Sequence, residues 1–424
     1  MILSVKSCGS HGQNSKDADR MEKTRRHSPA FRYGVLAVLF WLALYWANYL
    51  TVYLQCLGFS SKVIGYVTAG AAATGMLGNF FIGRISDRLR TVKWLVLVLL
   101  AAVGVMFLLF PVVSDKYVMG LSLALLWWPL TCLFRAPVST LAENWIVRGS
   151  HKEGFNYGIV RAGGSVGSCI SSVAASLMIT ALYGVMSQTE AVGLTYTTGG
   201  LLMLVCAAYA LSVRDVRESE KKVQAKKLKI GRLTSDYYFV ALLIFNFALN
   251  FFINPPFVFL PYILTEAGID SAMVGLIVGW ESLLEVPMLF LLVSLRRKVP
   301  LHVLLIASGG LFAVNILGQG VSHSLLMLLV SGVFFGFANG LNFSCGYEFV
   351  YRLAPVELKA TAHTMYTIAS AAGIIAGNFV GGGLLEKMGT RPFYYLFAFA
   401  AFLVSAAYAL SFVLGKKVLK KELP

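Results

Sequence analysis

The stretch RDVRESEKKVQAKKLKIGRLTSD, residues 214–236, decides how the chain is organised. It is the longest polar stretch inside a chain of 424 residues that is 57% hydrophobic and only 13% charged. A soluble domain carries about 25% charged residues. Most of the remaining chain must therefore face lipid or other helices, and the stretch divides it into two apolar halves of similar length.

Each half contains six apolar segments long enough to cross a bilayer. Crossing the hydrocarbon core takes about 20 apolar residues in a helix. We therefore predict an all-α membrane protein with a tail over residues 1–32, bundles over 33–213 and 237–414, a linker over 214–236 and a tail over 415–424. The expected spans are 33–54, 63–84, 92–112, 118–147, 157–183, 194–213, 237–262, 271–294, 299–319, 323–350, 360–383 and 392–414.

The distribution of basic residues predicts the orientation. Of the 36 Lys and Arg residues, two lie within expected spans and only four lie in the loops expected outside: Lys62, Lys116, Lys387 and Arg391. Basic residues concentrate on the cytoplasmic side of membrane proteins. We therefore expect a multi-pass protein of the cell membrane with both termini in the cytoplasm. This orientation accounts for the net charge of +16, so no nucleic-acid partner is expected.

Glu143 and Arg161 are opposite charges inside two consecutive expected spans. A charge near the bilayer centre costs at least ~2.5–3.5 kcal/mol, so such residues are usually paired and functional. Each lies nine residues from Lys152, the middle of the polar turn His151–Glu153. In an antiparallel helix hairpin, equal spacing from the turn predicts similar depth and an ion pair. The alternative is a purely structural clamp between the two helices.

Further polar and aromatic residues inside the spans are candidates for coupling and binding. Glu281 and Glu285 are four residues apart and share a helix face. Their mutual repulsion in a low dielectric favours protonation of at least one, as proton coupling requires. Asn246 and Asn250 also share a face, and Trp128 offers a platform for a sugar or aromatic ring. The alternatives are solvation at a wet rim for the carboxylates and plain packing for the others.

Gly83-Arg-Ile-Ser-Asp87-Arg88-Leu-Arg90 fills the expected cytoplasmic turn between the second and third spans. Glycine allows a tight turn there, and the Asp and Arg side chains can bond to helix ends and neighbouring loops. Together with the twelve spans, this stretch resembles the loop signature of the major facilitator superfamily. The resemblance implies two pseudo-symmetric six-helix bundles around a central cavity, and a gating role for Gly83, Asp87 and Arg88.

Tyr157-Gly-Ile-Val-Arg161-Ala-Gly-Gly-Ser-Val-Gly167 resembles the fifth-helix signature of the lactose-permease-like branch, which includes oligosaccharide, phenylpropionate and nucleoside permeases. This resemblance implies that Glu143 and Arg161 bind the solute. Glu285-Val-Pro287 is similar to an eighth-helix motif of phenylpropionate permeases and bacterial sugar-efflux proteins. Two features depart from lactose permease: Ser168 replaces its sugar-stacking Trp, and the tenth span lacks its His and Glu coupling residues.

The predicted function is secondary active transport of a small polar or amphipathic solute (a sugar, nucleoside or aromatic acid) by alternating access, as a proton symporter. Proton-coupled efflux of sugars or drugs is the alternative. A non-transporting sensor or a membrane enzyme fits less well, because no histidine pairs with an intramembrane acid by helical spacing and no phosphate-binding loop is present. The six cysteines lack metal-ligand spacing, so neither a metal nor another cofactor is expected. The expected partners are the solute, protons and the lipid bilayer, with the protein a monomer.

Overall fold

The computed structural model describes residues 29–89, 91–118, 120–215 and 231–417. Most of the predicted N-terminal tail, residues 216–230 of the predicted linker and residues 418–424 lie outside the described residues. The domain bounds predicted from the sequence therefore stay predictions.

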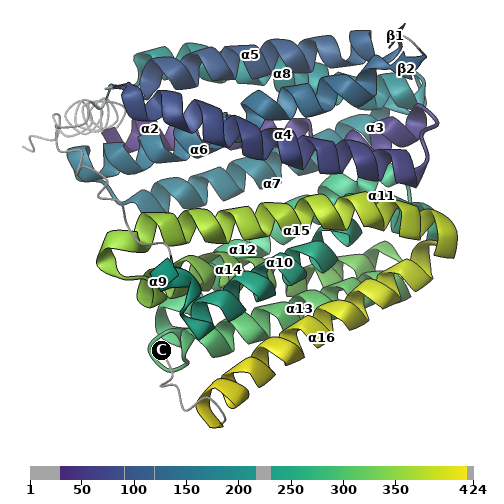
Figure 1. The fold of residues 1–424 in the computed structure, drawn as a ribbon. Coiled ribbons are helices and arrows are strands. Elements are labelled where there is room, and N and C mark those ends of the chain that lie inside the picture. Colours follow the sequence, from purple (N-terminus) through teal and green to yellow (C-terminus); the bar gives the residue numbers. More distant parts are fainter. Residues whose placement is uncertain (1–28, 90, 119, 216–230, 418–424) are drawn as a thin grey trace, which may run out of the picture.

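Helices make up nearly all of the described chain (Figure 1). The N-terminal half contains α2 (Pro29–Trp46), α3 (Leu50–Cys56), α4 (Ser61–Arg88), α5 (Lys93–Ser114), the strands β1 (Tyr117–Val118) and β2 (Leu121–Ser122), α6 (Leu123–Glu153), α7 (Tyr157–Leu182) and α8 (Gln188–Ser212). The C-terminal half contains α9 (Gly231–Thr234), α10 (Tyr237–Val258), α11 (Leu260–Glu266), η1 (Ser271–Met273), α12 (Val274–Leu295), α13 (Leu301–Val321), α14 (Leu325–Leu353), η2 (Val356–Leu358), α15 (Lys359–Met388) and α16 (Thr390–Lys417).

Each half has six long helical segments when α2 is counted with α3 and α10 with α11. In the described residues, ten long helices are apolar enough to cross a membrane. The other two, α4 and α6, have 28 and 31 residues, but α4 is rich in Gly and Ala and α6 carries Arg135 and Glu143. The predicted all-α membrane fold of two six-helix bundles is confirmed.

The first and seventh predicted spans are each broken into two helices. A short break at residues 47–49 separates α2 from α3, and Phe259 separates α10 from α11. Pro255 and Pro256 precede the second break, and proline removes backbone donors that a continuous helix needs. The fourth span begins at Leu123 rather than residue 118, because a hairpin with a left-handed Gly120 (φ 79°) occupies residues 117–122. Both errors arise because an apolar pattern does not reveal a local break.

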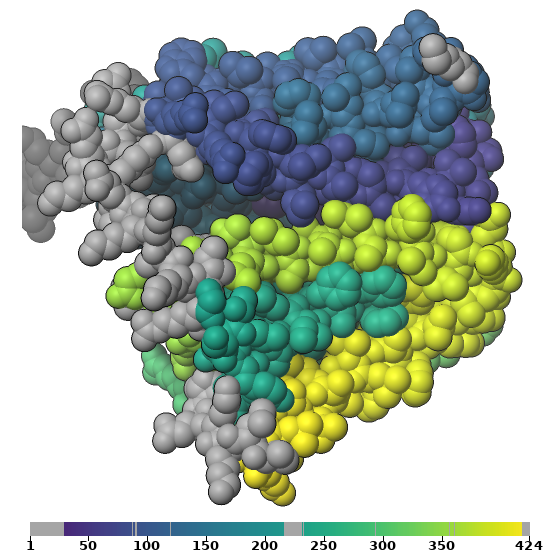
Figure 2. All heavy atoms as spheres, in the orientation of Figure 1, coloured from purple at the N-terminus to yellow at the C-terminus, as the bar shows by residue number. Residues whose placement is uncertain are grey.

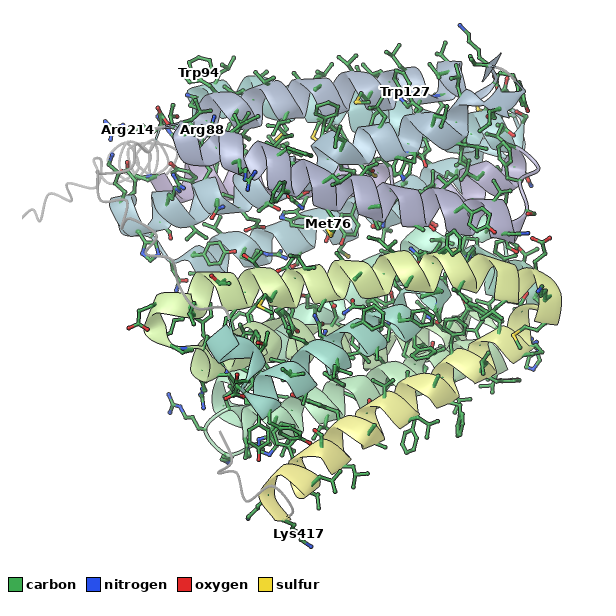
Figure 3. The ribbon with its side chains drawn as sticks, in the orientation of Figure 1. Met76, Arg88, Trp94, Trp127, Arg214 and Lys417 are labelled. Carbon is green, nitrogen blue, oxygen red and sulfur yellow. The ribbon has the colours of Figure 1, made fainter. Side chains whose placement is uncertain are left out.

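Large apolar side chains cover the outer surface of the helices. Val98, Phe290 and Leu326 are 65%, 71% and 71% exposed. Trp94 lies on the outer side of the N-terminal bundle (Figure 3) and is 60% exposed. An apolar surface of this extent is unusual for a soluble monomer. It is expected for helices whose outer faces contact lipid.

The two bundles meet along two helix pairs, α4 with α15 and α7 with α12. Figure 1 shows the start of α2, the end of α8, α9 and the end of α16 at one end of the molecule, and β1 and β2 at the other. We call these the tail end (Pro29, Arg214 and Lys417) and the hairpin end (β1 and β2). In Figure 2, α4 in purple lies directly against α15 in yellow-green.

Close contacts between the bundles lie toward the hairpin end. The Ser61 hydroxyl donates to the Gly382 carbonyl over 3.1 Å, and a side chain at Gly65 would meet the Asn378 carbonyl at 2.6 Å. On the other pair, a side chain at Gly275 would meet the α7 backbone at 2.2 Å. Glycines permit such close approach of helices. The molecule is therefore closed at its hairpin end.

Adding a methyl group at Gly382 should prevent this closure. A Cβ there would lie 2.3 Å from the Ser61 carbonyl oxygen, whereas a Cβ at Gly383 would meet nothing within 4 Å. We expect Gly382→Ala to lengthen the distance between spin labels at positions 62 and 387, in a cysteine-free background, and to slow transport. Gly383→Ala is the matched control and should leave both unchanged. An unchanged distance distribution in Gly382→Ala would show that the contact does not control closure.

Candidate functional site

A cavity of about 980 Å³ lies between the bundles. Residues of α2, α3, α4, α6, α10, α12 and α15 line it, and Met76 of α4 marks its place between the bundles in Figure 3. The volume is in the range of pockets that hold a small organic solute. Most of the wall is apolar, and its polar residues are Asn48, Thr51, Thr68, Asn79, Arg135, Ser139, Asn254, Thr364, Thr367 and Asn378.

Glu143 of α6 and Arg161 of α7 form the ion pair predicted from the sequence. Arg161 Nε lies 3.4 Å from Glu143 Oε1, and the two side chains are 26% and 23% exposed. Trp41 Nε1 donates to Glu143 Oε1 over 3.1 Å, and the Tyr157 hydroxyl donates to Oε2 over 2.8 Å. The Arg161 guanidinium also lies 4.8 Å from the centroid of the Trp41 ring. One ion pair, two hydrogen bonds and one cation–π contact therefore fix the carboxylate and the guanidinium in place.

The connection between these helices differs from the one predicted. His151–Glu153 belongs to the last turn of α6, and the chain reverses at Gly154, whose φ of 74° is left-handed. Glu143 and Arg161 are therefore not equally spaced from the turn. The predicted equal spacing does not explain their contact. The two side chains meet because α6 packs against α7 and both side chains are long.

Trp41 links the ion pair to the cavity. Its ring lines the cavity wall, while its N–H bonds to Glu143 and its face lies against Arg161. The ion pair itself lies behind this ring, outside the cavity wall as described. A solute that occupies the cavity can thus reach the charges by displacing or contacting one indole.

Trp41→Phe tests this link. Phenylalanine keeps an aromatic face for the guanidinium but removes the N–H donor to Glu143. A hydrogen bond to a charged group contributes about 1.5–3 kcal/mol, so we expect solute affinity or uptake to change by about tenfold or more. Initial uptake rates over a solute concentration series measure this effect. Trp94→Phe, on the outer surface, is the matched control, and equal behaviour of the two variants would contradict a role for Trp41.

Glu285 of α12 is a carboxylate of the C-terminal bundle that interacts electrostatically with the Glu143–Arg161 pair. Asn339 Nδ2 donates to Glu285 Oε2 over 3.3 Å, and the Arg161 guanidinium attracts this carboxylate electrostatically. Arg161 thus pairs with a carboxylate of its own bundle and attracts one of the other. This arrangement can couple occupancy of the site to the contact between the bundles.

Glu281 lies one turn before Glu285 but in a different environment. Its side chain is 2% exposed, and neither carboxyl oxygen has a hydrogen-bond partner among the described residues. It packs against Gly332 of α14, where an added Cβ would lie 3.2 Å from its Cγ. The side chain is thus buried within the C-terminal bundle and does not line the cavity. Its predicted role as a helper in proton coupling stays a prediction.

Asn246 and Asn250 bond within the C-terminal bundle in this conformation. Asn246 Nδ2 donates to the Tyr366 carbonyl over 2.8 Å, and Asn250 Nδ2 donates to the Asn246 carbonyl and side-chain oxygens. Both are buried, and neither lines the cavity as described. The two side chains bond to each other along one face of α10, and their contact with a solute stays a prediction. Trp128, the other predicted binding residue, does line the cavity.

The predicted gating loop lies at the tail end, but its turn begins later than expected. Helix α4 continues through Gly83 and Asp87 to Arg88, and a Cβ at Gly83 would meet nothing within 4 Å. The expectation that Gly83 forms a tight, close-packed turn was therefore wrong. Arg88 and Arg214 lie at the same end of the molecule (Figure 3). The Asp87 side chain lies outside the described residues, so its gating role stays a prediction.

Several polar residues of the cavity wall were not among the predicted site residues. They are Asn48, Arg135, Asn254 and Asn378. The sequence does mark Arg135 as a charge inside a span on the same helix face as Glu143, but no role in the site was predicted for it. The asparagines give no comparable signal, because only the packing of α10, α15 and the break between α2 and α3 decides which polar residues face the cavity.

Comparison with known proteins places this geometry in a family. The model of the MFS_1 like family matches residues 38–396, most of the chain. The chain belongs to the MFS_1 like family. It is therefore a major facilitator transporter, a multi-pass membrane protein that carries a small solute, and not an enzyme.

Two curated proteins are similar in sequence to most of this chain. The putative nucleoside transporter YegT of Escherichia coli (strain K12) is 24% identical over 361 residues, which cover 81% of each chain. The maltose permease of Geobacillus stearothermophilus is 24% identical over 384 residues, which cover 87% of this chain and 93% of the permease.

Two solved structures share the fold. The nucleoside transporter NupG matches with a TM-score of 0.73 and 15% identity, covering 91% of this chain and 99% of NupG. A bacterial homologue of the human lysosomal transporter Spinster, in an inward-facing and occupied conformation, matches with a TM-score of 0.65 and 15% identity. That match covers 93% of this chain and 98% of the homologue. At these identities the likeness concerns the fold alone.

Proposed function

We propose that this transporter carries a solute of sugar or nucleoside size by proton symport, with Glu143 and Arg161 as its principal ligands. The observation that carries the proposal is the position of Arg161. It pairs with Glu143 in one bundle and attracts Glu285 in the other, beside a cavity of suitable volume. The names of the curated relatives, a nucleoside transporter and a maltose permease, support the solute class.

The chemistry follows from the donors and acceptors present. A carboxylate accepts and a guanidinium donates hydrogen bonds, so the pair can bind the hydroxyl groups of a sugar or ribose by charge-assisted bonds. Binding there would redistribute the contacts of Arg161. Protonation of Glu285 removes its negative charge and hence its attraction to Arg161, which would loosen the link between the bundles. Solute and proton would thereby act on the same element.

Alternating access would use the glycine contacts at the hairpin end. In the described conformation that end is closed, so the cavity would communicate with the tail end. The distribution of basic residues supports a cytoplasmic tail end with both termini inside, in the cell membrane. This conformation is then inward-facing, and a single chain contains the whole site, consistent with a monomer.

The proposal is tested by a solute screen in proteoliposomes with an imposed pH gradient. We expect accumulation of uridine, maltose or a related solute when the gradient drives protons in the same direction, and none when a protonophore abolishes it. Accumulation of solute that is driven by protons moving in the opposite direction would identify the efflux alternative. Saturable binding without flux would identify a sensor, and the absence of both would contradict the proposed solute class.

A further inference from the structure

Arg135 is a second arginine at the centre of the molecule, and it faces the cavity. It lies near the middle of α6 and is the only Lys or Arg among the described residues that line the cavity. Its guanidinium lies 5.7 Å from the Trp128 ring centroid and contacts the Cys132 thiol, a weak acceptor. Its Nε is buried without a hydrogen-bond partner.

No carboxylate neutralises this charge in the part of the chain that the structure describes. The ion pairs among the described residues involve Arg161, Arg214, Arg296, Arg352 and Arg391, but not Arg135. The nearest acid on its own helix is Glu143, eight residues away, which corresponds to about 12 Å along the axis. That carboxylate is already held by Arg161, Trp41 and Tyr157.

A charge inside a membrane-spanning segment is costly, so such residues are usually paired. Arginine stays charged in proteins, so loss of its proton does not relieve this cost. Arg161, the other arginine inside a predicted span, is neutralised by a carboxylate of the protein itself, Glu143. Arg135 lacks such a partner but faces the space where a solute would lie. The missing partner is therefore expected on the solute.

We propose that Arg135 binds a carboxylate of the transported solute, which is therefore a monoanionic organic acid. This inference rests on the proposed transport function and its solute size, and it adds a carboxylate to the solute. One unbalanced positive charge matches one negative charge, and the guanidinium fork binds a carboxylate through two parallel hydrogen bonds. A doubly charged phosphate would need a second cation in the described cavity wall. The Trp128 ring, beside the guanidinium, would contact the apolar or ring part of the same solute.

Binding of matched acids and neutral analogues to the full-length protein in nanodiscs tests the proposal. The probes are 3-phenylpropionate against 3-phenylpropanamide, and methyl glucosiduronate against methyl glucoside. For at least one pair, we expect the wild-type protein to bind the acid about tenfold or more tightly than its neutral analogue. Arg135→Gln should remove that preference and leave the affinity for the neutral analogue unchanged. Arg135→Lys keeps the charge without the fork and should restore only part of the preference.

Several outcomes would overturn the proposal. These are equal or tighter binding of the neutral analogues, an equal loss for acid and analogue in Arg135→Gln, and no saturable binding of either acid. Tighter binding of glucose 6-phosphate than of either carboxylate would assign the subsite to phosphate instead. If Arg135→Gln does not fold, Arg135→Lys alone should still lower affinity for the acid and not for its analogue.

Measurements of flux distinguish failure of the proposed transport function from failure of the Arg135 proposal. Flux of uridine or maltose that Arg161→Ala abolishes and Arg135→Gln leaves unchanged would support transport through the Glu143–Arg161 site. It would at the same time contradict an acidic solute. Proton-driven flux of an acid that depends on both arginines would support both proposals.

Discussion

Arg161→Ala is expected to abolish solute flux while the protein remains folded and inserted. The substitution removes the guanidinium that pairs with Glu143 and attracts Glu285. Hydrogen bonds to charged groups contribute about 1.5–3 kcal/mol each. Loss of two such bonds from the guanidinium to the solute would therefore lower the affinity for the solute by about 100-fold or more. Glu143→Gln removes the opposite charge and should have a similar effect. Uptake into proteoliposomes, with the amount of inserted protein measured, checks both variants.

The chain offers a matched control for this pair. Arg214 and Glu153 also form an ion pair, with Arg214 Nη1 3.7 Å from Glu153 Oε1, but the Arg214 side chain is 80% exposed. Exposed ion pairs contribute about 0–1 kcal/mol to stability. Arg214→Ala should therefore transport normally. If Arg161→Ala transports as well as Arg214→Ala does, the central pair is only a clamp between helices.

Glu285→Gln is expected to abolish proton-driven accumulation and preserve solute exchange. The amide can still accept a hydrogen bond from Asn339, but it cannot gain and lose the proton that coupling requires. The variant would therefore bind solute and alternate between its two conformations without using the pH gradient. Accumulation under an imposed gradient and counterflow without a gradient measure the two activities separately.

Counterflow serves as the internal control for Glu285→Gln. Loss of both activities would indicate a binding or structural role for this carboxylate, and unaltered accumulation would exclude it from coupling. Asn339→Ala removes the amide that bonds to the carboxylate without removing the titratable group. We expect it to retain accumulation.

The membrane-spanning fold could be predicted because its cause is local in the sequence. A helix must satisfy its backbone hydrogen bonds internally in lipid, so length and hydropathy suffice to find most spans. Glu143 and Arg161 were found for a related reason, since isolated charges in apolar segments require partners. Even α4 and α6, the two least hydropathic of the long helices, were expected from their length and position.

The details that failed depend on neighbours in space. Gly83 was expected in a tight turn, but α4 continues past it because nothing interrupts its backbone hydrogen bonds. The Tyr366 carbonyl on α15 accepts the Asn246 amide in this conformation, and contact of Asn246 and Asn250 with a solute stays a prediction. Helical periodicity does not settle such questions, because periodicity identifies a face and not what covers it.

The sequence by itself determined that the chain spans a membrane in two halves, which residues inside the spans are charged, and which pairs share a helix face. These properties follow from the free energy of placing each side chain in lipid or water and from the regular helix repeat. Only the tertiary structure decided that Arg161 pairs with Glu143 and attracts Glu285, and that Glu281 is buried within the C-terminal bundle. It also decided that Arg135 faces the cavity with no carboxylate partner among the described residues. Those relations join helices far apart in the chain, and helix packing sets them through contacts that no local pattern contains.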